Sequence, residues 1–266
     1  RRPHEDDSVC VLVEHTASVV LSKVRNQTMK LYGKNPVLER LKSNPKSIRH
    51  VLIEENHVES AYVFKKCNQH NISCSKVPHS KIQRLAQSMN TQGIVADVED
   101  YQYVDLNTLI ENALDKKRHI IFLDNLTDPQ NLGGILRTAG SIGDFDVVLP
   151  TTEAVNVTES VLRVACGGEN FLSIAKVSNL ANAIQKAKDA GFWIMGTSVH
   201  EATVLNDVKM QYPLGVVLGS EEKGVRDVIR KKLDCEVVIP MKIERMSLNV
   251  AHAASILCWE IQRQKN

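Results

Sequence analysis

The sequence contains no apolar run of the roughly 18 residues that a membrane-spanning helix needs. The mildly apolar stretch from Val9 to Leu21 is interrupted by Glu14 and His15, and acidic residues precede it where a secretory signal would be basic. We therefore expect neither a membrane span nor a secretory signal, and a cytoplasmic location. The chain begins at Arg1 instead of methionine, which leaves open a removed presequence and an organellar location.

Cysteine is sparse and has no metal-binding spacing. The six cysteines, at positions 10, 67, 74, 166, 235 and 258, form no Cys-x-x-Cys pair. In a chain of this size they indicate scattered, reduced thiols and not a disulfide framework or a zinc site. We expect no metal at the functional site.

Common catalytic signatures are also missing. No Gly-x-Gly-x-x-Gly follows a predicted strand, because Gly133, Gly134, Gly140 and Gly143 have a different spacing. A Gly-x-Ser-x-Gly turn and a Cys–His arrangement are absent as well. These absences argue against a dinucleotide-dependent metabolic enzyme and against a hydrolase.

The 266 residues are 43% hydrophobic and 24% charged, which supports a folded core and excludes wholesale disorder. Short β-branched runs alternate with amphipathic stretches, a pattern that predicts an α/β protein with a parallel sheet in its second half. We expect a tail at 1–28, a small α/β domain at 29–100, a linker with one helix at 101–117, and a larger domain at 118–266.

The predicted strands cover 48–54, 72–77, 93–98, 119–123, 146–149, 192–196, 214–218 and 236–239. The predicted helices lie near 36–42, 58–69, 80–89, 132–142, 158–166, 180–190, 225–233 and 248–263, with Asn35-Pro36 as the start of the first. Ligands of parallel sheets gather at the carboxyl ends of the strands, so the loops that follow strands are where chemistry is expected.

Three such loops stand out. The loop 124–134 is polar, has Asp128 as a helix cap, and contains two glycines that we interpret as room for a ligand. The loop 218–224 is glycine-rich, but its two glutamates disfavour phosphate. The third loop, 239–249, has Ser247 as a helix cap and places Asn249 in the first helical turn, where an amide is a poor helix former. From spacing alone these loops indicate a polar site.

In this order the loops resemble the three motifs of the SpoU/TrmH branch of the SPOUT RNA methyltransferases. The motifs read DPQNLGGILRTA (128–139), LGSEEKGV (218–225), and IPM (239–241) followed by SLNVA (247–251). The stretch LYGKNPVL (31–38) also resembles the start of the small substrate-binding domain that ribosomal-RNA members carry. The similarity is greatest to the two-domain group that methylates a guanosine of large-subunit ribosomal RNA.

The resemblance implies a catalytic domain with a trefoil knot, S-adenosylmethionine as methyl donor, and a homodimer that transfers a methyl group to a ribose 2′-hydroxyl of RNA. It assigns the catalytic roles to Asn131, Arg137, Glu221, Ser247 and Asn249. It assigns cofactor binding to Thr197, Leu218, Gly219, Ile239, Met241 and Leu248. Family members usually have glycine in place of Glu222 and Ile243, so we expect the loop 242–246 to be remodelled.

Two roles for Arg137 stay open. A ribose hydroxyl needs a base or a neighbouring positive charge to become a nucleophile, and a guanidinium is almost always protonated. Arg137 is therefore either an unusual base or an electrostatic clamp on phosphate and hydroxyl. The alternatives to a ribosomal-RNA guanosine are a transfer-RNA substrate, an adenosine-directed resistance enzyme, and a catalytically weak RNA-binding or ribosome-assembly protein.

The formal net charge is only +2, but it is unevenly distributed. Residues 1–117 hold 17 Lys and Arg against 14 Asp and Glu, whereas residues 118–266 hold 16 against 17. The segment 22–49 is the most basic, and we interpret it as a surface that follows RNA phosphates. The candidate RNA-binding residues are Lys30, Lys34, Arg40 and Lys42.

Overall fold

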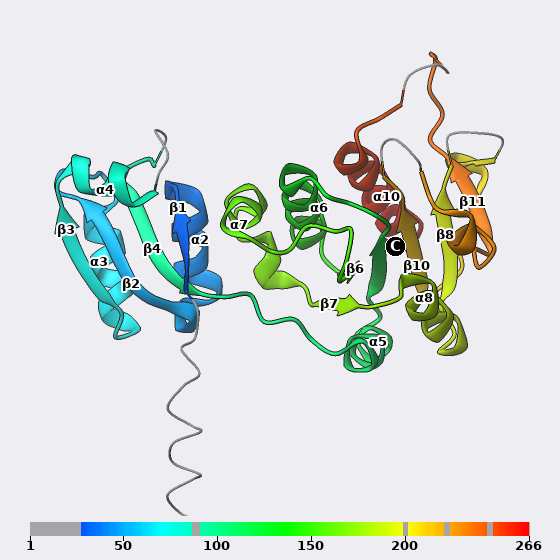
Figure 1. Cartoon of the computed structure of the whole chain (residues 1–266), viewed down its shortest axis with the longest axis horizontal. Helices are drawn as coiled ribbons and strands as arrows, with labels where there is room; N and C mark the ends of the chain where they lie inside the picture. Colours follow the sequence, from blue (N-terminus) through cyan, green and yellow to red (C-terminus); the bar gives the residue numbers. More distant parts are fainter. Residues whose placement is uncertain (1–27, 87–90, 199–201, 221–223, 244–246, 266) are drawn as a thin grey trace, which may run out of the picture.

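The computed structural model describes residues 28–86, 91–198, 202–220, 224–243 and 247–265. Two α/β units follow one another along the chain, joined by an extended segment and the helix α5 (Leu106–Asp115) (Figure 1). The predicted α/β class is therefore confirmed. Within the described residues no helix is long and apolar enough to cross a bilayer.

The first unit is built on a four-stranded mixed sheet in the order β1-β4-β2-β3. β1 and β2 run antiparallel to β4, and β3 runs parallel to β2. The strands are β1 (Thr28–Tyr32), β2 (Ile48–Glu54), β3 (Ser73–Val77) and β4 (Ile94–Glu99), and the helices are α2 (Lys34–Ser43), α3 (Ser60–Gln69) and α4 (His79–Ala86), with a 3-10 turn at Pro45–Ser47. β1 was not among the predicted strands, although its sequence TMKLY alternates between polar and apolar residues as a strand with one buried face does.

The second unit is a parallel seven-stranded sheet in the order β7-β6-β5-β10-β8-β11-β9. Its strands are β5 (His119–Leu123), β6 (Phe145–Pro150), β7 (Ile174–Val177), β8 (Trp193–Thr197), β9 (Thr203–Val204), β10 (Leu214–Leu218) and β11 (Cys235–Val238). Its helices are α6 (Pro129–Ile142), α7 (Glu159–Ala165), α8 (Leu180–Asp189), α9 (Asp227–Arg230) and α10 (Val250–Lys265), with 3-10 turns at Gly168–Phe171 and Leu205–Asp207. β10 lies between β5 and β8, so the strand order reverses there.

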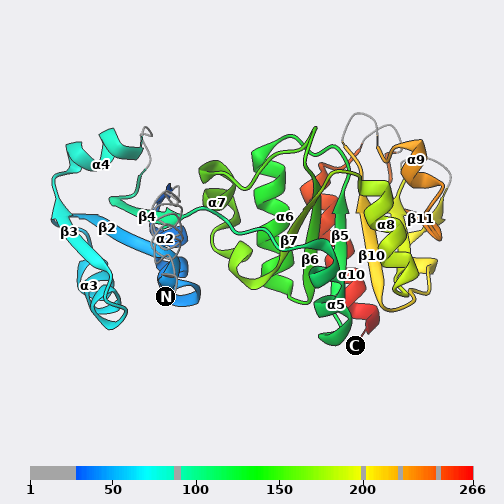
Figure 2. The same cartoon turned by 60° about the horizontal axis from the view of Figure 1, so that its bottom comes forward.

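Helices cover both faces of this sheet (Figure 2). Along β5, Ile121 and Leu123 face the core that contains α6, α7 and α10, whereas Ile120 and Phe122 face the core that contains α5, α8 and α9. A strand that is buried on both faces has a continuous run of apolar residues in its sequence. The sequence of β5, HIIFL, is apolar at every position except His119.

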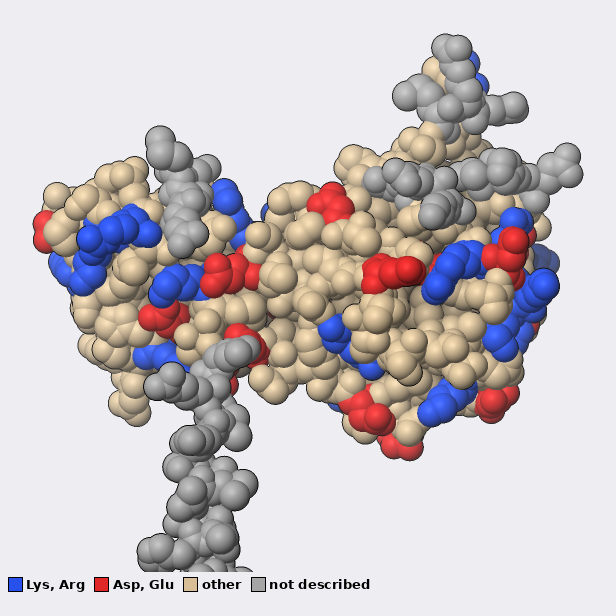
Figure 3. Space-filling view, in the orientation of Figure 1, with Lys and Arg blue, Asp and Glu red and all other residues tan. Residues whose placement is uncertain are grey.

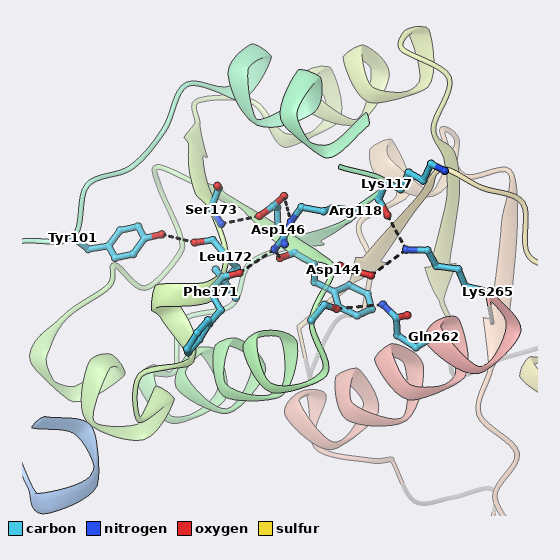
Figure 4. A network of polar contacts seen from close by, with 12 residues as sticks. Tyr101, Lys117, Arg118, Asp144, Asp146, Phe171, Leu172, Ser173, Gln262 and Lys265 are labelled. Atoms are coloured by element: carbon cyan, nitrogen blue, oxygen red, sulfur yellow. Dashed lines mark hydrogen bonds and ion pairs between the residues drawn. The ribbon is translucent and has the colours of Figure 1, made fainter. Parts of the chain in front are cut away.

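A polar network fixes the amino-terminal edge of the sheet (Figure 4). Arg118 Nε donates to Asp146 Oδ2 over 2.8 Å, and Asp146 Oδ1 accepts the Ser173 N–H over 2.7 Å, which joins β5, β6 and the segment before β7. The Tyr101 hydroxyl from the linker donates to the Leu172 carbonyl, and Lys265 of α10 forms an ion pair with Asp144. The linker and the last helix are thus attached at the edge opposite the strand-exit loops.

The two units share a packed contact. Arg40 of α2 forms an ion pair with Glu169, which follows α7, with 3.3 Å between Nη1 and Oε1 and side-chain exposures of 3% and 1%. The same nitrogen donates to Asn170 Oδ1. The Lys30 N–H donates to Glu159 Oε1, and one continuous apolar core runs from α2 through α7 into α6. A buried guanidinium cannot reach RNA phosphate, so the prediction of Arg40 as an RNA-binding residue is wrong.

Candidate functional site

The carboxyl ends of adjacent parallel strands bring the predicted cofactor residues to one edge. Thr197 ends β8, its Oγ1 donates to the Val217 carbonyl of β10 over 3.4 Å, and the next N–H, of Ser198, donates to Val237 of β11 over 2.9 Å. Leu218 ends β10, with Gly219 directly after it, and Ile239 follows β11. Met241 and Leu248 are partly buried in the segments beyond that strand.

A buried carboxylate holds the loop after β10. Asp124, directly after β5, is fully buried and forms an ion pair with Arg226, with 2.6 Å between Oδ1 and Nη2. Its Oδ2 also accepts the Arg226 backbone N–H over 3.0 Å, and its own N–H donates to the Leu218 carbonyl over 2.8 Å. No role was predicted for Asp124. The sequence did contain an indication of this role, because Asp124 directly follows the apolar run of β5. A carboxylate at the end of a buried strand usually has a structural or catalytic role.

The first and third motifs meet through two amides. Asn131, buried in the first turn of α6, accepts a hydrogen bond at Oδ1 from Asn249 Nδ2 over 2.8 Å. Asn249 Oδ1 in turn accepts the Ala251 N–H over 2.9 Å, so Asn249 is the cap residue just before α10. The expected placements of Asn249 in the first turn and of Ser247 as the cap are therefore wrong. Ser247 lies exposed two residues earlier.

Arg137 projects from the middle of α6 and is exposed. Burial raises the pKa of the nearby Cys166 thiol, and the positive charge of Arg137 opposes that shift. The guanidinium makes no ion pair with any described residue. It is therefore free to bind an anion. Glu221, the remaining predicted catalytic residue, lies outside the described residues, as does Glu222.

The glycine pair of the first motif serves packing. A Cβ on Gly133 would lie 2.5 Å from Val164 Cβ on α7, and one on Gly134 would lie 3.1 Å from Ala251 Cβ on α10. These residues let α6 pack closely against both neighbouring helices, and the interpretation that they leave room for a ligand is wrong. Asp128, in contrast, caps α6 as predicted, accepting the Gln130 N–H over 2.9 Å.

The strand edge fits S-adenosylmethionine in its chemistry. A Cβ on Gly219 would lie 2.1 Å from the Gly224 backbone, so glycine is needed here for the end of β10 to lie close to the backbone of Gly224. Among the described residues, this edge offers backbone N–H and C=O groups and the Thr197 hydroxyl, which can form hydrogen bonds with a nucleoside. The five described cysteines are free thiols, and the described residues hold no cluster of three metal-ligating side chains.

The candidate RNA-binding lysines are paired with carboxylates. Lys30 and Asp97 are 2.6 Å apart, Lys34 and Glu59 are 2.6 Å apart, and Lys42 lies 3.7 Å from Glu39 one turn earlier. Exposed ion pairs of this kind are weak, so a phosphate can compete for these lysines. Basic and acidic side chains are interspersed over both units on the face in Figure 3.

The structure therefore joins a small mixed-sheet unit to a parallel-sheet unit in which the first and third motifs meet beside the strand-exit loops. A family profile described as "SpoU rRNA Methylase family" matches residues 118–259, and one described as "RNA 2'-O ribose methyltransferase substrate binding" matches residues 30–104. The chain belongs to the SpoU rRNA methylase family of RNA 2′-O-methyltransferases.

Proteins of similar sequence or structure have names of the same family. A TrmH family protein of Staphylococcus saprophyticus, named as a tRNA/rRNA methyltransferase, is 34% identical over 240 residues, covering 89% of this chain and 96% of its own. The similarly named YacO of Bacillus subtilis is 34% identical over 238 residues, covering 88% and 95%. The SpoU methyltransferase AviRb of Streptomyces viridochromogenes, solved with AdoMet, shares the fold with a TM-score of 0.72 at 21% identity, covering 90% of each chain.

Proposed function

We propose that the protein methylates the ribose 2′-hydroxyl of a guanosine in large-subunit ribosomal RNA with S-adenosylmethionine as donor. The hydrogen bond between Asn131 and Asn249 supports this proposal most, because it joins the first and third motifs beside the strand edge. The match of residues 30–104 to a family described as RNA 2′-O ribose methyltransferase substrate binding supports an RNA substrate.

In this proposal Thr197, Leu218, Gly219, Ile239, Met241 and Leu248 hold S-adenosylmethionine. The bound sulfonium would supply an electrophilic methyl group. Asn131 and Asn249 order the site, with Glu221 and Ser247 completing its polar groups. Arg137 is solvent-exposed, so nothing desolvates its guanidinium, and we assign it the role of a clamp on the target phosphate and hydroxyl rather than that of a base.

We further propose that residues 29–100 capture RNA and residues 118–266 carry out methyl transfer, in a cytoplasmic or organellar protein. Lys30, Lys34 and Lys42 contribute to RNA binding by exchanging carboxylate partners for phosphate. The trefoil knot stays a prediction, since the segments 221–223 and 244–246 lie outside the described residues.

A homodimer is part of the proposal. Trp259 is 66% exposed and Ile256 is 39% exposed, and the two lie one turn apart on the same side of α10. A large exposed aromatic next to an exposed aliphatic residue is typical of an interface. Light scattering is expected to give twice the chain mass for the wild type and a single mass for Trp259→Glu. A monomeric wild type would contradict the dimer.

The substrate assignment is tested by mapping 2′-O-methyl groups in ribosomal and transfer RNA from cells with and without the protein. We expect one large-subunit guanosine to lose its methyl group. An unchanged ribosomal profile beside a lost transfer-RNA methyl group would overturn the ribosomal assignment. Unchanged profiles in both RNAs, together with no S-adenosylmethionine binding by calorimetry, would favour an RNA-binding or assembly protein.

A further inference from the structure

A cavity of about 410 Å³ lies between the two units. Tyr32, Gly33 and Asn35, from the stretch LYGKNPVL, form one wall. Gln130 and Arg137, from the first methyltransferase motif, form part of the other. Two sequence motifs from different units therefore line one cavity that is open to solvent, and Arg137, the residue assigned to the chemistry, is part of its lining.

The cavity wall contains two cations. Arg163 of α7 and Arg137 of α6 both line it, and neither makes an ion pair with any residue in the described ranges. The Arg163 guanidinium carbon lies 5.2 Å from the centre of the Tyr32 ring, which holds the side chain across the boundary between the units. Asn35 belongs to the first turn of α2, whose end has no side-chain cap and favours negative charge. This arrangement suits a phosphate.

The lining also contains three exposed amide side chains, those of Asn35 and Gln92 from the first unit and of Gln130 from the second. Gln92 Oε1 accepts the Lys34 N–H over 2.8 Å, which orients its amino group as a donor. Amide side chains carry both a donor and an acceptor and pair with the edges of nucleobases. The cations can therefore bind the phosphate of a nucleotide, and the amides can bind its base.

We propose that this cavity binds one unpaired nucleotide of the RNA, adjacent to the methylated one. Arg163 holds its phosphate beside Arg137, which clamps the methylated nucleotide, and the amides contact the edge of its base. The proposal rests on the proposed function and extends it to the form of the substrate. A base inside a duplex cannot offer its pairing edge to a cavity between two protein units, so the RNA must be single-stranded here. The volume lies within the range of small-ligand sites, about 300–1,000 Å³.

The two walls are held in a fixed relation. Glu169 follows α7, which carries Arg163, and its buried ion pair with Arg40 attaches that element to α2, which carries Asn35. The Lys30 N–H, one strand residue before the LYGKNPVL stretch, also donates to Glu159 of α7. The cavity is therefore formed before RNA binds, which lowers the ordering cost of binding.

The test measures the dissociation constant of the full chain by fluorescence anisotropy for a mixed-sequence 12-nucleotide RNA, single-stranded and as a duplex. We expect the wild type to prefer the single strand, and Asn35→Ala and Arg163→Gln each to lower that preference about tenfold. Matched controls are Asn182→Ala, an exposed asparagine in the first turn of α8, and Arg84→Gln, an exposed arginine on α4. The controls are expected to keep the preference.

Equal wild-type affinity for both RNAs, or equal losses in cavity and control variants, would overturn the proposal. Thermal unfolding of each variant checks the fold, and Gln130→Ala replaces any variant that fails to fold. Methyl transfer by the wild type is assayed separately. If the wild type transfers methyl groups but the cavity variants bind RNA like the wild type, the cavity proposal is refuted and the proposed function is kept. If the cavity variants lose the preference for single-stranded RNA but the wild type transfers no methyl group, the cavity proposal is supported and the proposed function is refuted.

Discussion

Asn249 Nδ2 donates to Asn131 Oδ1 over 2.8 Å and so joins two residues 118 positions apart in the sequence. One residue lies in the first turn of α6 and the other caps α10. Because the cap uses the oxygen of Asn249 and the contact with Asn131 uses its nitrogen, the two roles of one side chain can be separated by substitution.

Asn249→Ser is expected to keep the cap and lose the contact with Asn131. Serine caps a helix about as well as asparagine, so only the lost hydrogen bond to the buried Asn131 should lower the free energy of unfolding, by about 1 kcal/mol. Its side chain is too short to reach Asn131, and methyl transfer should fall about tenfold or more. Urea unfolding and single-turnover kinetics measure the two effects. Wild-type turnover in this variant would show that the contact only stabilises the fold.

Arg137→Ala is expected to bind S-adenosylmethionine like the wild type and to lose methyl transfer by about 100-fold or more, as when an electrostatic donor is removed from an active site. Arg137→Lys should recover part of the rate if charge is what matters, and less than the full rate because lysine cannot bind two oxygens at once. Calorimetry for the cofactor and radiolabel transfer to RNA check both variants. Unimpaired transfer by Arg137→Ala would remove this residue from the mechanism.

Arg40→Met is expected to destabilise the folded chain by about 3 kcal/mol, because it leaves the Glu169 carboxylate buried without its cation. Burial raises the pKa of Glu169 and the charge of Arg40 lowers it, so the carboxylate depends on that partner. The double variant Arg40→Met/Glu169→Gln should recover most of the lost stability. Denaturant unfolding of the two variants measures the difference. Equal stability of single and double variants would show that the pair is not coupled.

The free energy of unfolding is expected to fall as the pH drops from about 6.5 to about 4, because His119 is harder to protonate in the folded chain than in the unfolded chain. This side chain is buried between Phe145 and Tyr212, and burial, aided by the charge of Lys265, lowers its pKa to about 4. The unfolded chain takes up a proton near pH 6.5, and the folded chain does so only near pH 4. Acidification through this window should therefore cost up to about 3 kcal/mol.

His119→Phe should flatten this acid limb, because phenylalanine fills the same space without a titrating group. Urea unfolding at pH 7 and pH 5 compares the variant with the wild type. Identical pH slopes for the two proteins would exclude His119 as the source.

Much of the fold could be predicted because strands buried on both faces have a distinct sequence pattern. The strands β5 and β10 are of this kind, and the predictions 119–123 and 214–218 agree with them at both ends. The prediction 48–54 also agrees with β2, which is only partly buried. The strands β7 and β9 were missed, because Lys176 interrupts the apolar run of the first and the second has only two residues. The roles of Gly133 and Arg40 could not be predicted either. Each depends on a partner brought close by tertiary packing, Val164 for the glycine and Glu169 for the arginine.

The central claim is tested most directly by incubating the purified chain with S-adenosylmethionine and unmodified large-subunit ribosomal RNA, then digesting the RNA and identifying its nucleosides by mass spectrometry. We predict that 2′-O-methylguanosine appears with the wild type and not with Arg137→Ala. A methyl group on a nucleobase, or no methyl group on ribosomal RNA while transfer RNA is methylated, would contradict the account.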